Sequence, residues 1–557
     1  LDCRQLDSKL YPFLVIPVGG VEHEASAQGG IIKLTLRKQR DDGLEGSLRM
    51  RYGTRLNDNP QQYIQPSLSI NYRLAKFSLY TDITENRNKY YGYGIARRIN
   101  KNGYSFESNW RQSSLKDSPT LRVGTIYDIS PRHSVGVEAN LAGYFPEKER
   151  SSVVDTVFYN GALQGTIESD YNYLNKHKNW NLSANYIARF DTVGSTFKLL
   201  FDYVRTHPHT GGYVEVDHII PGDAYTYRSN NESQNDLYSV TGDFDIRAGD
   251  NARVKTGFKY IFSQVDSWMK YEDLVGDIWV VRPDQTYDMV YDEHISAAYG
   301  RYTYTFDSKI SVGVGLRLEH TYAMPAATGV NNIERQNYFS FFPQADLILP
   351  LGDSHQLIFN YARKIRRPSF WLLIPLRRPI SETEVAVGNP KLKPSFSHEF
   401  SLNWVIRQKY TVTAGAYLMN DVWVSTPRVD PDDPMSLIRT PENQNSSSMW
   451  YVSAAVPVQV TPWWSFNTNL VGTLAWYHID QYRKSNHRLT GNLINTFTLR
   501  EGTSLMLSAY GHTRNRYEYT QYAGAYYINA GITQQLLKGA MTLSAQVNNI
   551  FDTRNSW

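Results

Sequence analysis

Apolar and polar residues alternate one by one over long segments, and this period of two constrains the fold more than any other feature of the sequence. In residues 309–320, Leu316 and Leu318 fall on one face and Arg317 and Glu319 on the other. Successive side chains of a strand point to opposite sides of a sheet, so the pattern predicts strands with one apolar and one polar face. The same alternation occurs in residues 67–74, 134–141, 254–262, 395–406 and 541–549.

The connections between these segments are of two kinds. Short turn-like stretches lie at residues 72–76, 306–309 and 351–354, whereas long polar stretches lie at 208–235, 266–293, 366–394 and 425–447. A strand that crosses lipid needs ~9–11 residues, which matches the segments. Short turns at one end and long loops at the other indicate an outer-membrane barrel. We therefore expect the long stretches on the extracellular side and the short turns on the periplasmic side.

Composition agrees with a barrel. Hydrophobic residues make up 41% of the 557, and no apolar run approaches the ~18 residues of a transmembrane helix. Aromatic residues reach 13%, and Tyr and Trp gather near the predicted strand ends, as they do at membrane–water interfaces. A soluble propeller would show a repeat of ~40–50 residues, and none is present. We predict an all-β fold, a transmembrane antiparallel barrel of about 20–22 strands over residues 43–557.

Charge and cysteine exclude several classes of protein. The 58 basic and 54 acidic residues nearly balance, so the sequence does not indicate a nucleic-acid partner. Cys3 is the single cysteine, which excludes an intramolecular disulfide and a cysteine-based zinc site. No nucleophile elbow, phosphate loop, zincin helix or dinucleotide fingerprint occurs. We expect no enzymatic activity and no cofactor.

Three motifs carry a resemblance to a known family. The first is Gly29, Gly30, Ile31 and Ile32, which precede a basic end at Lys38. It resembles the last plug strand of TonB-dependent outer-membrane receptors, and Gly43 to Leu48 resemble the first barrel strand of that family. The other two motifs resemble a barrel signature and a late barrel strand; their matching positions are Arg367, Pro368, Gly388, Asn389, Pro390, Leu392, Pro394, Asn549 and Phe551.

The resemblance implies a function and a set of partners. It implies a barrel in the outer membrane of a Gram-negative cell, in contact with lipid and lipopolysaccharide, that takes up a scarce nutrient. The nutrient would be an iron chelate, a cofactor, a peptide or a glycan, and a surface lipoprotein is a further possible partner. An inner-membrane energy-coupling complex would act on the plug. The alternative is a passive pore without a plug, or a surface protein that displays binding loops.

The chain departs from the family pattern at both ends. Only residues 1–42 precede the first barrel strand, whereas a whole plug needs a domain-sized ~100–150 residues. We therefore expect residues 1–42 to hold a short plug remnant, and we expect the barrel to lack its last strands at the C-terminus. A fragment of a transporter and a natural barrel without a plug both fit.

Three polar clusters are weaker candidates for sites. His207, His209, Glu215, Asp217 and His218 are possible transition-metal ligands, but such residues are common in solvated loops. The acidic stretches 382–384 and 430–433 lack the spacing of a calcium loop. A basic concentration could bind an anion, although a charged barrel end is the better explanation and needs no ligand; it comprises Arg363, Lys364, Arg366, Arg367, Arg377 and Arg378.

Overall fold

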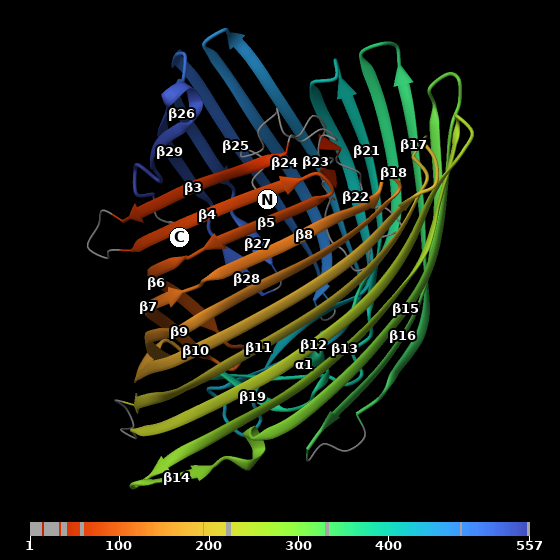
Figure 1. Ribbon diagram of the computed structural model, residues 1–557. Coiled ribbons are helices and arrows are strands. Elements are labelled where there is room, and N and C mark those ends of the chain that lie inside the picture. The colour runs from red at the N-terminus through yellow and green to blue at the C-terminus, as the bar shows by residue number, and fades with distance from the viewer. Residues whose placement is uncertain are drawn as a thin grey trace.

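The strands of the chain form one large barrel-shaped sheet (Figure 1). The computed structural model describes residues 14–15, 33–34, 42–55, 61–192, 194–218, 224–328, 333–479, 482–517 and 519–553. Within these residues, no helix has both the length and the apolar character needed to cross a membrane. The predicted all-β barrel is confirmed.

In the described part of the chain, twenty-one antiparallel strands make up the wall, each paired with the next in chain order, within the range predicted. They are β3 (Gly43–Thr54), β4 (Gln62–Leu74), β5 (Phe77–Thr84), β8 (Thr120–Ser130), β9 (His133–Tyr159), β10 (Ala162–Arg189), β11 (Thr196–His218), β12 (Tyr225–Ala248), β13 (Ala252–Val275), β15 (Tyr287–Thr305), β16 (Ser311–Ala327), β17 (Gln336–Leu351), β18 (His355–Arg366), β21 (Ser395–Ile406), β22 (Tyr410–Val429), β23 (Leu437–Thr461), β24 (Trp464–Ile479), β25 (Tyr482–Arg500), β26 (Thr503–His512), β29 (Ala525–Leu536) and β30 (Met541–Val547).

The remaining elements lie outside this chain-order series of strands. They are β1 (Leu14–Val15) with β2 (Lys33–Leu34), β6 (Arg87–Ile99) with β7 (Tyr104–Asp117), β14 (Ile278–Val281), α1 (Phe370–Leu373), β19 (Arg377–Ser381) with β20 (Glu384–Val387), β27 (Asn515–Tyr517) with β28 (Thr520–Tyr522), and the 3-10 turns Pro283–Gln285 and Leu537–Gly539.

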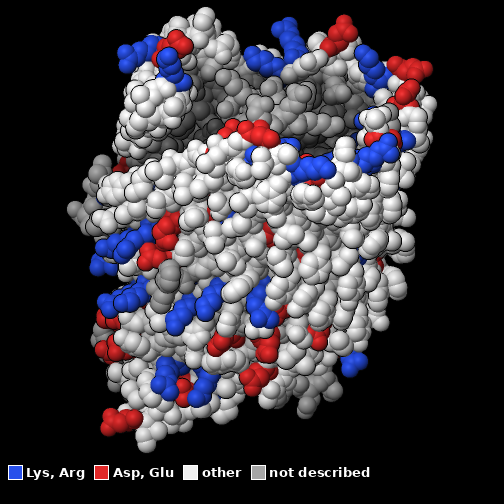
Figure 2. Space-filling model, in the orientation of Figure 1, with Lys and Arg blue, Asp and Glu red and all other residues white. Residues whose placement is uncertain are grey.

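The predicted facing of the strands is confirmed in β16. Leu316 and Leu318 are 45% and 41% exposed on the outer surface, whereas Arg317 and Glu319 are 1% and 2% exposed and point inward. Figure 2 shows the result for one face of the barrel, where a broad band nearly free of charge separates charged side chains at the rim from those over the other half. Such an apolar band is the part of a barrel wall that faces lipid.

The two ends of the barrel differ as predicted. At one end short turns join the strands, for example residues 306–310 between β15 and β16 and residues 352–354 between β17 and β18. The four long stretches all lie at the opposite end, which we call the long end. Strands β9 to β13 have 23 to 28 residues, far more than lipid requires, so they project beyond the membrane there.

The prediction that the long stretches are loops is wrong for most of their length. Residues 208–218 belong to β11, and most of residues 266–293 belong to β13 and β15. The reason is that the apolar face changes sides along a strand. Leu199 and Phe201 are exposed on the lipid side of β11, whereas Val214 and Val216 are buried inside the barrel mouth. Beyond the lipid the outer surface meets water, so the apolar residues turn inward.

Candidate functional site

The connection between β18 and β21, residues 367–394, folds into the barrel at the long end and is the candidate functional site. We call it the mouth loop; it contains α1, β19 and β20. Its buried Leu373 and Leu392 pack with Val265, Tyr291 and Ala323, which are inward-facing residues of β13, β15 and β16. The loop is therefore held inside the barrel by an apolar core of its own.

A second apolar contact lies beside the first. Ile374 of the mouth loop is buried against Tyr287 and Met289 of β15. Trp371 and Leu376 lie at the edge of this cluster. Inward apolar residues of β13, β15 and β16 at the long end thus pack against the loop.

The predicted signature positions of the mouth loop fold back on the loop itself. At Gly388 an added Cβ would lie 2.2 Å from the carbonyl oxygen of Ile374, so only glycine fits there. The backbone N–H of Asn389 donates to the carbonyl of Leu372 at 2.6 Å. The Asn389 side chain donates to the carbonyl of Pro441 at 2.9 Å and accepts from the N–H of Lys391 at 3.0 Å. The motif closes the loop onto the start of β23.

Arg367 anchors the beginning of the mouth loop. Its guanidinium donates to Glu319 and, at 3.2 Å, to the hydroxyl of Thr321. Arg317 donates to the same Glu319 carboxylate at 2.6 Å, and the carboxylate is buried. Burial of Arg367 opposes its charge, but the Glu319 carboxylate outweighs this and raises the pKa of Arg367.

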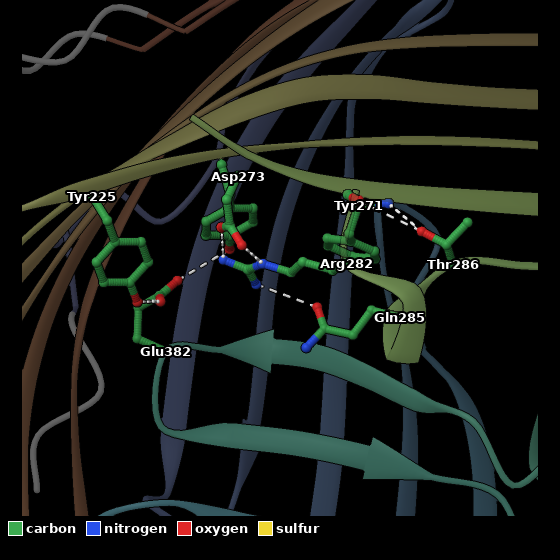
Figure 3. Close-up of polar contacts among 8 residues, drawn as sticks. Tyr225, Tyr271, Asp273, Arg282, Gln285, Thr286 and Glu382 are labelled. Carbon is green, nitrogen blue, oxygen red and sulfur yellow. Dashed lines mark hydrogen bonds and ion pairs between the residues drawn. The ribbon is translucent and has the colours of Figure 1, made fainter. Parts of the chain in front are cut away.

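The far tip of the mouth loop reaches across to other strands. Tyr225 and Tyr227 of β12 both donate to the Glu382 carboxylate, Tyr227 at 3.0 Å. Arg98 of β6 donates to the Thr383 hydroxyl at 2.8 Å and to its carbonyl at 3.2 Å. Figure 3 shows Glu382 at the turn of the β19–β20 hairpin, beneath Tyr225. The tip is therefore tied to strands that are far from β18 and β21 in the sequence.

The rest of the hairpin is tied to β23 and its neighbours. Strand β20 pairs with β23 in parallel, and Glu384 forms ion pairs with Arg98 and Arg439. Arg377 at the start of β19 donates to the buried carboxylate of Asp430. Burial disfavours the charge of Asp430, but the hydrogen bonds from Arg377 and from the Asp432 backbone outweigh it and lower the pKa of Asp430.

A cluster of tyrosines lines the wall beside the hairpin. Tyr227 and Tyr271 are buried, and Tyr171, Tyr173 and Tyr225 pack against them. In Figure 3 Arg282 extends between Asp273 and Gln285; it donates to Asp273 at 2.8 Å and to Gln285 at 3.3 Å. Its guanidinium lies 4.8 Å from the ring centre of Tyr227. Phenol hydroxyls and fixed guanidinium groups thus surround the mouth loop.

The six basic residues proposed as an anion patch are all engaged within the protein. Arg367 and Arg377 bind Glu319 and Asp430, and Lys364 forms an ion pair with Glu399 at 2.9 Å. Arg363, Arg366 and Arg378 lie over the rings of Phe396, Trp423 and Trp371. The concentration therefore joins neighbouring strands and anchors the mouth loop, and it is not an open anion site.

The histidine cluster does not form a metal site in the described part of the chain. Among those residues, no group of three or more His, Cys, Asp or Glu side chains is arranged so that it could hold a metal ion. His207 and His209 lie on β11, where both contact Glu232 of β12, at 2.7 and 3.5 Å. The acidic residues Asp430 and Asp433 accept hydrogen bonds from backbone N–H groups two residues further on, as turn residues do.

The remaining signature positions lie near the two ends of the chain. Gly29, Gly30, Ile31 and Ile32 fall outside the described residues. Asn549 and Phe551 were predicted within a strand, but they follow β30, which ends at Val547. Asn549 has a positive φ of 50° and its side chain accepts from Thr553, so it forms a turn instead.

Sequence reasoning missed the residues that receive the mouth loop. The sequence pattern places Glu319 on the lumenal face and Asp430 in an acidic loop, but it does not show that either one anchors the mouth loop. It gives no role to Tyr225, Tyr227 or Arg98. One signal was available: Tyr287, Met289 and Tyr291 alternate in β15 with polar residues beyond the lipid-facing part, which indicates an interior that something must fill.

An antiparallel barrel with an apolar outer band, short turns at one end and long strands at the other is an outer-membrane barrel. The model of the outer membrane protein beta-barrel family matches residues 188–557, and the chain belongs to this family. The protein is therefore located in the outer membrane. A comparison with curated protein sequences gives no match.

Solved structures share the fold at low sequence identity. The siderophore receptor PirA from Pseudomonas aeruginosa is 13% identical with a TM-score of 0.63, covering 100% of this chain and 87% of PirA. The copper transporter OprC is 14% identical with a TM-score of 0.65, covering 96% and 79%. The ferric enterobactin receptor PfeA from Pseudomonas aeruginosa is 14% identical with a TM-score of 0.61, covering 94% and 78%. These neighbours are receptors and transporters, not enzymes.

Proposed function

We propose that the protein is an outer-membrane receptor that binds a scarce nutrient at the long end and passes it into the barrel. The observation that carries this proposal is the mouth loop, which fills the barrel mouth with fixed, inward-packed residues. A passive pore works best with an open lumen, whereas a receptor needs a built surface on which a ligand can be recognised.

The long end faces the outside of the cell in this proposal. Bacterial outer-membrane barrels place their short turns in the periplasm and their long connections outside. The mouth loop and the tyrosine cluster then lie where a nutrient arrives.

The ligand class that we propose is a metal chelate, with an iron–siderophore complex as the first choice. The support is the shared fold with PirA and PfeA, whose names give a siderophore and ferric enterobactin as their ligands. The tyrosine cluster agrees, because Tyr171 and Tyr173 lie in it beside the hairpin and phenol hydroxyls can form hydrogen bonds with an oxygen-rich chelate. Energy for uptake would come from an inner-membrane complex acting through residues 1–42, which we assign to the plug.

Ligand binding to the purified chain tests the proposal. Trp371 lies in the mouth loop and Trp423 packs against its core, so quenching of tryptophan fluorescence reports on ligands that reach the loop. We expect saturable quenching by at least one ferric siderophore in a panel, and loss of that response when residues 377–387 are replaced by a Gly-Ser linker.

A matched control removes another hairpin of the long end. Replacing residues 515–522, which hold β27 and β28, should leave siderophore binding unchanged. If no chelate binds, or if the deletion of 377–387 binds like the unaltered chain, the mouth loop is not the recognition site.

A further inference from the structure

Five exposed basic side chains lie together on the outer surface of the long end, just beyond the apolar band. We call them the basic cluster: Lys89, Lys148, Arg150, Lys176 and Lys178. Their placement follows from the strand pairing rather than from sequence proximity, because they come from β6, β9 and β10.

Lys176 and Lys178 face outward because of the alternation in β10. Ile167 and Ser169, at odd positions, are buried inside the barrel, whereas Trp180 and Leu182, at even positions, are 56% and 42% exposed on the outside. Even positions of β10 therefore point away from the lumen.

The partners of β10 place the other members on the same surface. Lys148 is opposite Leu174 and Arg150 is opposite Asn172, both at even positions of β10. Lys148 is also opposite Leu115 of β7, which in turn is opposite Lys89 of β6. Directly opposite residues are ~5 Å apart and diagonal ones ~7–8 Å, so the five cations form one continuous surface.

The cluster begins where the apolar band ends. Trp180, opposite Leu141, is an aromatic residue of the kind that marks a membrane interface. Lys178 and Lys176 lie two and four residues beyond it, or roughly 7 and 13 Å along the strand. This is the height of lipid headgroups. Figure 2 shows Lys and Arg side chains, with Asp and Glu side chains among them, below the uncharged band, over the part of the wall where Figure 1 places β6 to β11.

The side chains of the basic cluster form no hydrogen bond or ion pair with any described residue, whereas basic side chains on neighbouring strands are paired. Arg205, opposite Trp180, binds Asp236 at 2.7 Å, and Arg228 further along binds Glu272 at 2.6 Å. Asp170 and Glu215, opposite each other beyond Arg150, bound the cluster on the side away from the lipid. Five like charges held together repel one another unless an anion neutralises them.

We propose that the basic cluster binds the phosphate groups of lipopolysaccharide in the outer leaflet, with acyl chains along the apolar band beneath it. Lys and Arg are the residues that hold phosphate oxygens, and basic clusters beside a membrane select anionic lipids. The proposal rests on the outward orientation of the long end given under the proposed function. It does not depend on which nutrient is bound.

Binding of fluorescent lipids to the purified full chain in detergent tests it. The probes are diphosphoryl lipid A, the same lipid without phosphates, and phosphatidylglycerol. We expect diphosphoryl lipid A to bind at least tenfold more tightly than the other two, with an affinity that falls as salt is raised. The variant Lys148→Gln/Lys176→Gln/Lys178→Gln should lose at least tenfold in affinity.

Two controls separate charge from folding. Substituting the same three lysines by Arg should keep the affinity. Removing three basic residues at the short-turn end, with Lys76→Gln/Arg407→Gln/Lys409→Gln, should leave it unchanged. Equal binding of phosphate-free lipid A or of phosphatidylglycerol overturns the proposal, as does a glutamine variant that binds normally. Siderophore binding measured on the same samples shows separately whether the proposed receptor function holds.

Discussion

Leu316 and Arg317 are neighbours in the chain but face different solvents. Leu316 lies on the outer surface, while Arg317 is buried in the lumen beside Glu319 and 5.2 Å from the ring centre of Tyr299. A strand of period two makes this possible without any distortion, because each residue is turned about half a revolution from the last. The identity of a residue in this wall is thus set by the medium that its side chain meets.

Replacing Leu316 with Arg moves a charge onto the lipid face. In lipid vesicles, the free energy of unfolding of the variant should be about 2–4 kcal/mol lower than that of the unaltered chain if residue 316 lies near the bilayer midplane. Urea titration followed by tryptophan fluorescence measures this. Leu351→Arg, at the end of β17 near a short turn, should cost far less. An unchanged stability for Leu316→Arg would place the lipid on the other face of β16.

Replacing Glu319 with Gln removes the carboxylate that Arg317 and Arg367 share. Two buried guanidinium groups would lose their countercharge, and breaking a buried pair in this way costs roughly 3–5 kcal/mol. Glu107→Gln is the control, since its 3.7 Å pair with Arg97 is exposed and should be worth at most about 1 kcal/mol. Equal effects in the two variants would show that Glu319 does not anchor the mouth loop.

At the scale of elements, the β19–β20 hairpin is held by charge as well as by packing. The lowered pKa of Asp430 means that ionised Asp430 stabilises the folded loop. This contribution is present above the ordinary pKa of 3.8 and is lost as the pH falls below it towards the depressed folded value. The fluorescence of Trp371 should change in that acid range. The Asp430→Asn variant, which lacks the charge at every pH, should give at neutral pH the fluorescence that the unaltered chain gives in acid. An identical pH profile for both chains would contradict the role of this pair.

The connections between strands can be tested for orientation on intact cells. Added protease should cut the long end, for example at the exposed residues 276–277 and 431–432, and should spare short turns such as 306–310. Lysed cells provide the control, because the short turns then become accessible. Cutting confined to the short turns in intact cells would reverse the proposed topology.

The wall could be predicted from the sequence, but the mouth loop could not. Alternation in residues 309–320 identifies a strand and its faces because both depend only on neighbours in the chain. The sequence predicts a loop at residues 208–218 because their apolar residues face inward, opposite to those in the lipid. The contact of Arg98 with Thr383 joins residues 285 positions apart, and no local pattern encodes it.

The N-terminal expectations remain predictions. Residues 29–32, which resemble the last plug strand, lie outside the described residues, so their assignment to a plug rests on the motif alone. The signature around Gly388 is different, because its physical role is visible in the close approach to Ile374.

At the scale of the whole molecule, the apolar band and the inward core at the long end have complementary roles. The band places the barrel in the membrane, and inward residues of β13, β15 and β16 form the core that holds the mouth loop. A barrel of this many strands encloses a wide lumen, which conducts ions unless it is filled. If the protein is a receptor, the flow of ions must be blocked by the mouth loop together with whatever else occupies the lumen.

Conductance of the purified 557-residue chain in a planar lipid bilayer tests this account most directly. We predict a silent or low-conductance channel, and a clear rise in conductance when residues 377–387 are replaced by a Gly-Ser linker but not when residues 515–522 are. A large, steady conductance from the unaltered chain, unchanged by that replacement, would contradict the account and favour a passive pore.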